Sequence, residues 1–113
     1  MFERDLHGAL VSVVIPCFNE EAVIQATYCR LVEVLGSLLE IEFKLILVDD
    51  GSSDRTPAIL RNLQSADSRV KVVLFSRNFG HQIAVTAGIE HASGEAVVLT
   101  PVLPHVILLP VAS

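Results

Sequence analysis

Short apolar runs recur along the chain at spacings typical of alternating strands and helices. Residues 10–16 (LVSVVIP) and 42–48 (EFKLILV) are rich in apolar and β-branched side chains, a pattern that favours strands buried on both faces. Residues 70–75 (VKVVLF) and 95 to about 99 (EAVVL) repeat the pattern later in the chain. The sequence therefore predicts four strands.

The segments between these runs have the periodicity of helices. Residues 20–39 place apolar side chains at spacings of four, three, four and three, which predicts one buried stripe. Its members are Ile24, Tyr28, Leu31, Leu35 and Leu38. A second helix is expected from Thr56, as N-cap, with Pro57 at its first position.

A third helix is predicted over residues 81–92, where Ala84, Ala87 and Gly88 form a face small enough to approach a sheet closely. The resulting order β-α-β-α-β-α-β, with short connections, implies right-handed crossovers and an α/β, Rossmann-like, mostly parallel sheet. In such sheets ligands bind beyond the carboxyl ends of the strands. The loops that follow the strands should therefore carry the chemistry.

Composition narrows the class of protein. The chain has 113 residues, 51% of them hydrophobic and 19% charged, which suits one folded domain and argues against disorder. A net charge of −5 disfavours a protein that binds nucleic-acid backbones.

Both ends of the chain bear on its location. The first eight residues mix charges and lack the apolar core of a signal peptide. Residues 96–113 carry no formal charge but are short and interrupted by prolines, so no transmembrane segment is expected. Cys17 and Cys29 lack metal-ligand spacing and are expected to be free buried thiols. The prediction is a cytoplasmic protein, with a peripheral position on the cytoplasmic face of the membrane as the alternative.

The loop after the first strand contains Pro16, Phe18, Asn19 and Glu20. Pro16 ends the strand because it lacks an N–H, and the ring of Phe18 offers a flat face to a base. Taken alone, Asn19 and Glu20 are better explained as a helix cap and a charge that complements the helix dipole.

The loop after the second strand begins with Asp49 and Asp50, whose side chains should point in different directions because strand residues alternate. One carboxylate could accept hydrogen bonds from a base or ribose while the other ties down the turn. Gly51 permits a positive φ or a close backbone approach. An ordinary Asx turn leading into a helix explains the same residues.

The loop after the third strand contains Arg77, which could pair with a diphosphate beside the N-terminus of the next helix. His81 could contact phosphate there, although packing or capping in the first turn is the stronger interpretation. GxGxxG, GxxxxGK[ST] and GxSxG are absent, which argues against a classical dinucleotide fold, a P-loop nucleotidase and an α/β-hydrolase.

Taken together, the three loops resemble the motifs of family 2 glycosyltransferases of the GT-A fold. The matching segments are residues 13–21 (VVIPCFNEE), 47–54 (LVDDGSSD) and 76–82 (SRNFGHQ). Residues 86–88 (TAG) and 91–95 (HASGE) resemble the branch that transfers sugars to polyprenyl or dolichyl phosphate. The resemblance covers about residues 10–99 and implies the N-terminal, nucleotide-binding half of a GT-A domain.

The resemblance also implies roles for individual residues in binding a UDP- or GDP-sugar. The base and ribose site would comprise Pro16, Phe18, Glu20, Val48 and Asp50, with Asp49 supporting its loop. Phe18 stands where the family often has tyrosine, so stacking would survive without the hydroxyl. Arg77, Asn78 and Gly80 would lie near the diphosphate and sugar.

The chain departs from the family after the fourth strand. There the family has a D-x-D motif whose carboxylates hold Mg²⁺ or Mn²⁺. Here residues 99–104 read LTPVLP, and no carboxylate follows residue 95. We therefore expect no metal site and no catalytic residue in this chain, and a cation only in full-length relatives.

The expected organisation is an N-terminal extension over residues 1–9, an incomplete nucleotide-sugar-binding part over 10–99, and an atypical apolar, proline-rich tail over 100–113. Full-length relatives would transfer a hexose from a UDP- or GDP-sugar to a polyprenyl-phosphate acceptor, and this chain would be a truncated, inactive copy. The alternative is a non-catalytic nucleotide-binding or protein-interaction module, or a gene remnant. These residues do not separate uracil from guanine.

Overall fold

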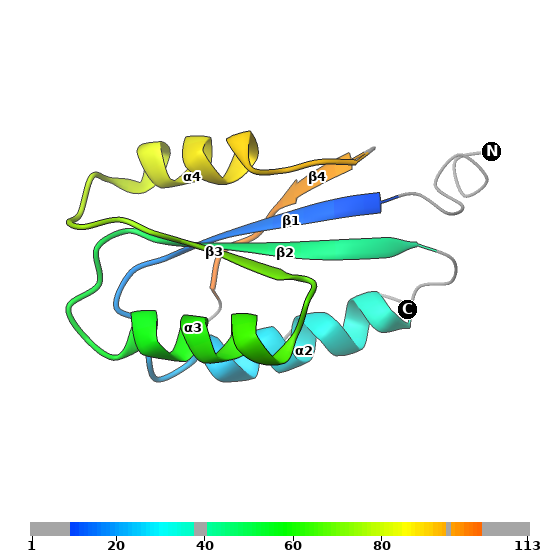
Figure 1. The fold of residues 1–113 in the computed structure, drawn as a ribbon, viewed down its shortest axis with the longest axis horizontal. Helices are drawn as coiled ribbons and strands as arrows, with labels where there is room; N and C mark the ends of the chain where they lie inside the picture. Colours follow the sequence, from blue (N-terminus) through cyan, green and yellow to red (C-terminus); the bar gives the residue numbers. More distant parts are fainter. Residues whose placement is uncertain (1–9, 38–40, 95, 103–113) are drawn as a thin grey trace.

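The computed structural model describes residues 10–37, 41–94 and 96–102, which form a sheet with helices on both faces (Figure 1). Strands and helices alternate in the predicted order. The strands are β1 (Leu10–Cys17), β2 (Glu42–Asp49), β3 (Val70–Leu74) and β4 (Ala96–Leu99). The helices are α2 (Ile24–Gly36), α3 (Thr56–Ala66) and α4 (His81–Glu90).

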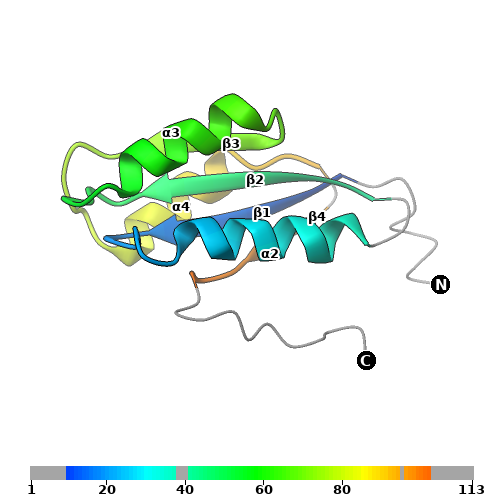
Figure 2. The ribbon, with the colours of Figure 1, turned by 90° about the horizontal axis from the view of Figure 1, so that it is seen from below.

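The described strands pair in the order β3-β2-β1-β4, and each pair is parallel, which confirms the predicted α/β class. The chain moves from β1 through β2 to β3 on one side and then crosses back to place β4 on the other side of β1. Helices α2 and α3 cover one face of the sheet and α4 covers the opposite face (Figures 1 and 2). The loops after β1, β2 and β3 consequently gather at one edge of the sheet.

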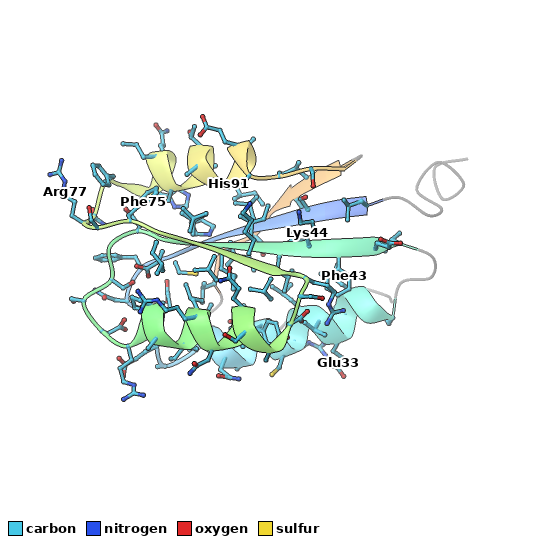
Figure 3. All side chains as sticks on the ribbon, viewed as in Figure 1. Glu33, Phe43, Lys44, Phe75, Arg77 and His91 are labelled. Atoms are coloured by element: carbon cyan, nitrogen blue, oxygen red, sulfur yellow. The ribbon has the colours of Figure 1, made fainter. Side chains whose placement is uncertain are left out.

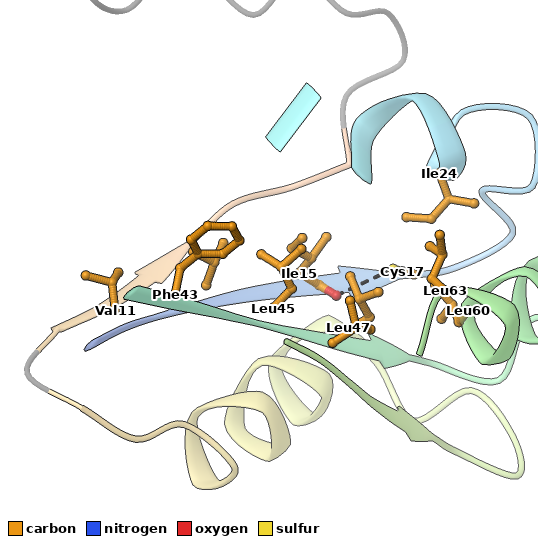
Figure 4. Packing of buried hydrophobic residues seen from close by; sticks show 11 residues of the cluster. Val11, Ile15, Cys17, Ile24, Phe43, Leu45, Leu47, Leu60 and Leu63 are labelled. Carbon is orange, nitrogen blue, oxygen red and sulfur yellow. Dashed lines mark hydrogen bonds between the residues drawn. The ribbon is translucent and has the colours of Figure 1, made fainter. Parts of the chain in front are cut away.

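The core has two layers because strand side chains alternate between the faces of the sheet. The larger layer lies between the sheet and helices α2 and α3 (Figure 4). Its members include Val11, Ile15, Cys17, Ile24, Phe43, Leu45, Leu47, Leu60 and Leu63. The smaller layer, under α4, consists of Val14, Ile46, Val48 and Ala84. Strands β1 and β2 supply both layers, which explains why their sequences are nearly continuous apolar runs.

Helix α4 approaches the sheet closely through its small residues. Ala84 is fully buried, and a Cβ added to Gly88 would lie 2.3 Å from Cγ1 of Val14. This confirms the predicted small face for these two positions. Beyond the helix, the hydroxyl of Ser12 donates to the carbonyl of Ser93 (2.6 Å) and accepts from its N–H (2.9 Å), so the turn before β4 is held against β1.

Several sequence-based boundaries and burial assignments need correction. Helix α2 begins at Ile24, four residues after the predicted start, because residues 20–23 form a turn. Its predicted end at residue 39 and the predicted strand start at residue 95 lie outside the described residues. Cys17 is buried as expected, but Cys29 is exposed on α2. Within the described ranges, no helix has both the length and the apolar character needed to span a bilayer.

Asp67 links α2 to the turn between α3 and β3. Its carboxylate accepts hydrogen bonds from the Tyr28 hydroxyl (2.6 Å) and from Nε and Nη2 of Arg69 (2.9 Å each). The guanidinium of Arg69 also stacks over the ring of Phe43, at 4.5 Å from its centroid. The hydrogen bonds from Arg69 hold the pKa of Asp67 well below its usual range; burial opposes this, and the bond from Tyr28 supports it.

This carboxylate should make the fold sensitive to acid. A depressed pKa means that Asp67 stabilises the folded state above the pKa of an unfolded aspartate, about 3.9, and that this contribution is lost as the pH falls below it. Asp67→Asn should lower the free energy of unfolding at pH 7 by about 1.5–3 kcal/mol, the range for hydrogen bonds to charged groups. Urea unfolding from pH 7 to pH 3 should show the difference between the two proteins beginning to narrow below about pH 4, because the contribution is lost progressively as the pH falls towards the folded-state pKa. A constant difference across that pH range would contradict this role.

Candidate functional site

A cavity of about 260 Å³ lies at the carboxyl ends of the strands. It is lined by Pro16, Cys17, Phe18, Glu20, Asp50, Asn78, Gly80, His81 and Ala84. These residues come from the end of β1 and the β1–α2 loop, from the position after β2, and from the β3–α4 loop with the first turn of α4. The cavity is somewhat smaller than the ~300–1,000 Å³ typical of sites that enclose a drug-sized ligand. Its size suits part of such a ligand.

Six of the nine residues predicted for the site line this cavity: Pro16, Phe18, Glu20, Asp50, Asn78 and Gly80. The other three lie elsewhere. The side chain of Val48 is buried in the layer under α4, and that of Asp49 is buried within its own turn. Arg77 is exposed and extends from the β3–α4 loop at the end of the molecule, with its guanidinium 4.5 Å from the centroid of the Phe79 ring (Figure 3).

The two adjacent aspartates do face different ways. Asp49 ties down the β2–α3 turn, because its carboxylate accepts hydrogen bonds from the Ser52 backbone N–H (2.9 Å) and the Ser52 hydroxyl (2.5 Å). Asp50 lines the cavity and bonds to the β3–α4 loop instead. It accepts from the N–H of Phe79 (2.8 Å), the N–H of Gly80 (3.2 Å to Oδ2) and Nδ2 of Asn78 (3.0 Å). Asp50 therefore joins the second loop to the third.

Gly51 allows these two loops to touch. Its φ is +77°, in the left-handed region, and an added Cβ would lie 2.2 Å from the carbonyl carbon of Arg77 and 2.3 Å from the N of Asn78. Only a residue without a side chain fits both the backbone angle and the available space. The backbone of the β2–α3 loop thus packs directly on that of the β3–α4 loop.

The predicted capping role of Asn19 is wrong. Helix α2 starts at Ile24, and Oδ1 of Asn19 accepts a hydrogen bond from the backbone N–H of Ser53 (2.9 Å), across to the β2–α3 loop. The predicted role of Thr56 as a helix N-cap also needs correction. Its hydroxyl accepts from the N–H of Glu20 (2.9 Å), and its own N–H is bonded by the Asp54 carboxylate (2.9 Å). Both side chains join loops that are far apart in the sequence.

Glu20 contributes a partly buried carboxylate to the cavity wall. Burial raises the pKa of Glu20, a hydrogen bond from the Phe18 backbone lowers it, and the nearby charge of Asp54 raises it, so that the pKa lies above its usual range. Hydrogen-bond donors on a ligand would offset the cost of this burial. Ribose hydroxyls and the N–H groups of bases are donors of this kind.

Cys17, His81 and Ala84 also line the cavity but were not among the predicted site residues, although a phosphate contact by His81 was considered as the weaker interpretation. Burial raises the pKa of the Cys17 thiol, and the charges of Asp49 and Glu20 raise it further, so the thiol stays protonated. The thiol donates weakly to the carbonyl of Ile15 (3.4 Å). The position of His81 at the start of the helix after the third strand was a usable signal, because loops after parallel strands gather at one edge.

The residues near the cavity do not fit a divalent cation. In the described part of the chain, no three His, Cys, Asp or Glu side chains are arranged to hold a metal ion. Asp50 already accepts hydrogen bonds from three residues of the β3–α4 loop, which leaves it poorly suited as a ligand. After β4 the chain continues with Thr100 and Pro101, and the N–H of Thr100 extends the pairing to the carbonyl of Val14 (3.0 Å). These residues offer no carboxylate to a cation.

The parallel sheet, with its cavity built from the loops at the carboxyl ends of the strands, places this domain in the Rossmann-like α/β class. The model of one protein family, glycosyl transferase family 2, matches residues 12–100. This match covers most of the chain, and the chain therefore belongs to glycosyl transferase family 2.

Sequence relatives support the same assignment. The chain is 52% identical over 88 residues to the uncharacterized glycosyltransferase YkcC of Bacillus subtilis (strain 168). It is 40% identical over 88 residues to the bactoprenol glucosyl transferase of Shigella phage SfV. It is 42% identical over 89 residues to the undecaprenyl-phosphate 4-deoxy-4-formamido-L-arabinose transferase of Edwardsiella ictaluri (strain 93-146). Each alignment covers 78% of this chain but only 27–28% of the relative.

Solved structures share the fold. The mannosyltransferase PcManGT from Pyrobaculum calidifontis, in complex with GDP-Man and Mn²⁺, superposes with a TM-score of 0.72 at 24% identity over 88% of this chain and 30% of that one. S. aureus TarS in complex with UDP gives a TM-score of 0.68 at 24% identity over 81% of this chain and 27% of that one. These likenesses confirm the predicted GT-A type of α/β fold.

Proposed function

We propose that residues 10–99 bind the nucleotide part of a UDP- or GDP-sugar, as the donor-binding portion of a transferase that passes a hexose to a polyprenyl-phosphate acceptor. The observation that carries the proposal is the cavity, where an aromatic ring, a carboxylate and an amide from three interlocked loops meet. Relatives named for transfer to bactoprenol and undecaprenyl phosphate support this acceptor class. A cytoplasmic location at the membrane face belongs to the same proposal.

Each cavity residue has a role suited to its chemistry. The ring of Phe18, 44% exposed, would stack on the base, and Pro16 would pack beside it. The carboxylate of Glu20 would accept hydrogen bonds from the ribose or the base. The carboxylate of Asp50 would border the base. The side chain of Val48 is buried, so Val48 would border the base through its backbone.

The phosphate side of the ligand would lie at the β3–α4 loop. The first N–H groups of α4 point out of the helix N-terminus and attract anions. Gly80 directly precedes this helix, and Asn78 and Arg77 lie two and three residues before Gly80. The guanidinium of Arg77 can pair with two phosphate oxygens at once.

We further propose that the 113-residue chain binds the nucleotide without transferring the sugar. A diphosphate leaving group accumulates negative charge that Mg²⁺ or Mn²⁺ would neutralise. The segment after β4 in this chain lacks the carboxylates that would hold such a cation, which we expect only in full-length relatives.

Titration calorimetry of the purified chain with UDP and GDP tests the binding proposal. We expect at least one of them to bind with a Kd of about 0.1–1 mM, equivalent to roughly −4 to −5.5 kcal/mol, because the cavity holds only part of the ligand. Phe18→Ala should raise this Kd about tenfold, since base–aromatic stacking contributes ~1–3 kcal/mol. Ile89→Ala, which truncates an exposed side chain near the end of α4, should leave the Kd unchanged.

Two outcomes would overturn the proposal. If neither UDP nor GDP gives a heat of binding, the nucleotide-binding role is wrong, and an interaction module is the function that would remain. Steady release of UDP or GDP from a nucleotide-sugar by the 113-residue chain, in the presence of Mg²⁺ or Mn²⁺ and a polyprenyl phosphate, would refute the absence of transfer.

A further inference from the structure

Asn19 lies between two residues of the cavity wall but does not line the cavity itself. Its neighbours Phe18 and Glu20 both contribute to the lining. Asn19 has a φ of +53°, and it is the one non-glycine residue with positive φ in the described part of the chain. Asparagine tolerates this left-handed conformation better than most residues, because its short polar side chain can bond locally.

The side chain and backbone of Asn19 are both bonded to the β2–α3 loop. Its N–H donates to the hydroxyl of Ser52 (2.8 Å), and its Oδ1 accepts from the N–H of Ser53 (2.9 Å). The Ser52 hydroxyl in turn donates to the carboxylate of Asp49 (2.5 Å), which is almost fully buried at the end of β2. Asp49, Ser52 and Asn19 therefore form a continuous relay from the sheet to the β1–α2 loop.

Further bonds between these two loops follow Asn19. The N–H of Glu20 donates to Thr56, and the N–H of Glu21 donates to Asp54 (3.1 Å). The Glu21 carboxylate accepts from the N–H of Arg55 (2.8 Å). Asn19 directly follows Phe18 in the chain, so the relay is the contact adjacent to the aromatic ring. The conformation at Asn19 sets the direction in which the chain leaves Phe18 and enters Glu20.

We propose that Asn19 is a positioning residue for nucleotide binding, which the relay through Ser52 to Asp49 holds in the left-handed conformation that keeps Phe18 and Glu20 in the cavity wall. This inference rests on the proposed nucleotide-binding function. It assigns a role in ligand affinity to a residue that does not touch the cavity.

The test compares nucleotide affinity with stability in matched variants. Asn19→Gly keeps access to positive φ and removes only the amide, and Ser52→Ala removes the hydroxyl that receives the Asn19 N–H. Each should raise the Kd of the tighter-binding nucleotide about fivefold to tenfold, because each removes one of the hydrogen bonds that hold the loop. Ser52→Thr retains the hydroxyl and should restore a Kd close to that of the unchanged chain.

A stability control separates positioning from a general loss of structure. Tyr28→Phe removes a hydrogen bond to Asp67 at the opposite end of the sheet. It should lower the Tm, measured by circular dichroism, by at least as much as Asn19→Gly, with no change in Kd. The double variant Asn19→Gly/Ser52→Ala should raise the Kd beyond either single change, because Asn19→Gly removes the bond from the Ser53 N–H and Ser52→Ala removes the bond from the Asn19 N–H.

The outcomes distinguish this inference from the proposed function. If the unchanged chain binds neither UDP nor GDP, the proposed function fails and the inference fails with it. If the unchanged chain binds and Asn19→Gly binds equally well, the positioning role alone is wrong. A Kd for Ser52→Thr as high as that for Ser52→Ala would also refute the relay, and Ser52→Ala supplies the test should Asn19→Gly fail to fold.

Discussion

Replacing Gly51 with alanine should lower the free energy of unfolding by about 2–5 kcal/mol, the sum of a left-handed backbone penalty of ~1–2 kcal/mol and an overpacking cost of ~1–3 kcal/mol. The Cβ would meet backbone atoms of Arg77 and Asn78, which cannot rotate away as a side chain would. Since domains of this kind are stable by only ~5–15 kcal/mol, the change would remove a large part of the total. Equilibrium unfolding in urea, followed by circular dichroism, measures it.

Two other glycines provide controls for this measurement. A Cβ on Gly36, at the end of α2, meets no atom within 4 Å, so Gly36→Ala should leave stability unchanged or raise it by up to ~1 kcal/mol. Gly80 has a φ of +107° and a ψ of 156°, with open space around it, so Gly80→Ala brings a backbone penalty without a steric one. A loss for Gly51→Ala no larger than the ~1–2 kcal/mol backbone penalty would show that the close approach of the two loops is not the cause.

Replacing Asp50 with alanine should both destabilise the chain, by about 2–4 kcal/mol, and raise the Kd for nucleotide more than tenfold. The carboxylate is 5% exposed and accepts hydrogen bonds from Phe79, Gly80 and Asn78. Its removal leaves these donors without their partner and frees the β3–α4 loop from the β2–α3 loop. Because this loop forms one wall of the cavity, affinity and stability should fall together.

Controls can separate this effect from the loss of an acidic side chain. Glu33 lies on an exposed surface of α2 and pairs with Arg30, so Glu33→Ala should change stability by less than ~1 kcal/mol and leave the Kd unaltered. In a double-mutant cycle, Asn78→Ala should cost less in the Asp50→Ala background than alone, because each removes the other's partner. Additive losses would show that the two side chains act independently.

The strands and their parallel pairing were predictable from the sequence, because strands buried on both faces are composed mainly of apolar residues. Strands β1 and β2 have helices on both faces, and each consequently has a nearly continuous apolar run. The small face of α4 was predictable for a similar reason, because small residues at positions 84 and 88 allow the helix to lie against Val14 and Val48.

The polar residues of the loops were less predictable. Asn19 and Thr56 have the chemistry of helix caps, and a hydroxyl or amide can bond equally well to a nearby backbone N–H or to one far along the chain. Their actual partners, Ser53 and Glu20, lie 34 and 36 residues away in the sequence. Local patterns could not distinguish these alternatives.

The sequence by itself determined the alternation of strands and helices, the GT-A type of fold, the family and the edge of the sheet where polar loops gather. Only the tertiary structure decided which polar groups are used in binding one loop to another and which face the cavity. Asp49, Asp50 and Asn19 are similar in chemistry, yet they respectively tie a turn, join the second loop to the third, and join the first loop to the second. The physical reason is that a hydrogen bond depends on distance and direction within a few tenths of an ångström, and chain folding alone brings those loops together.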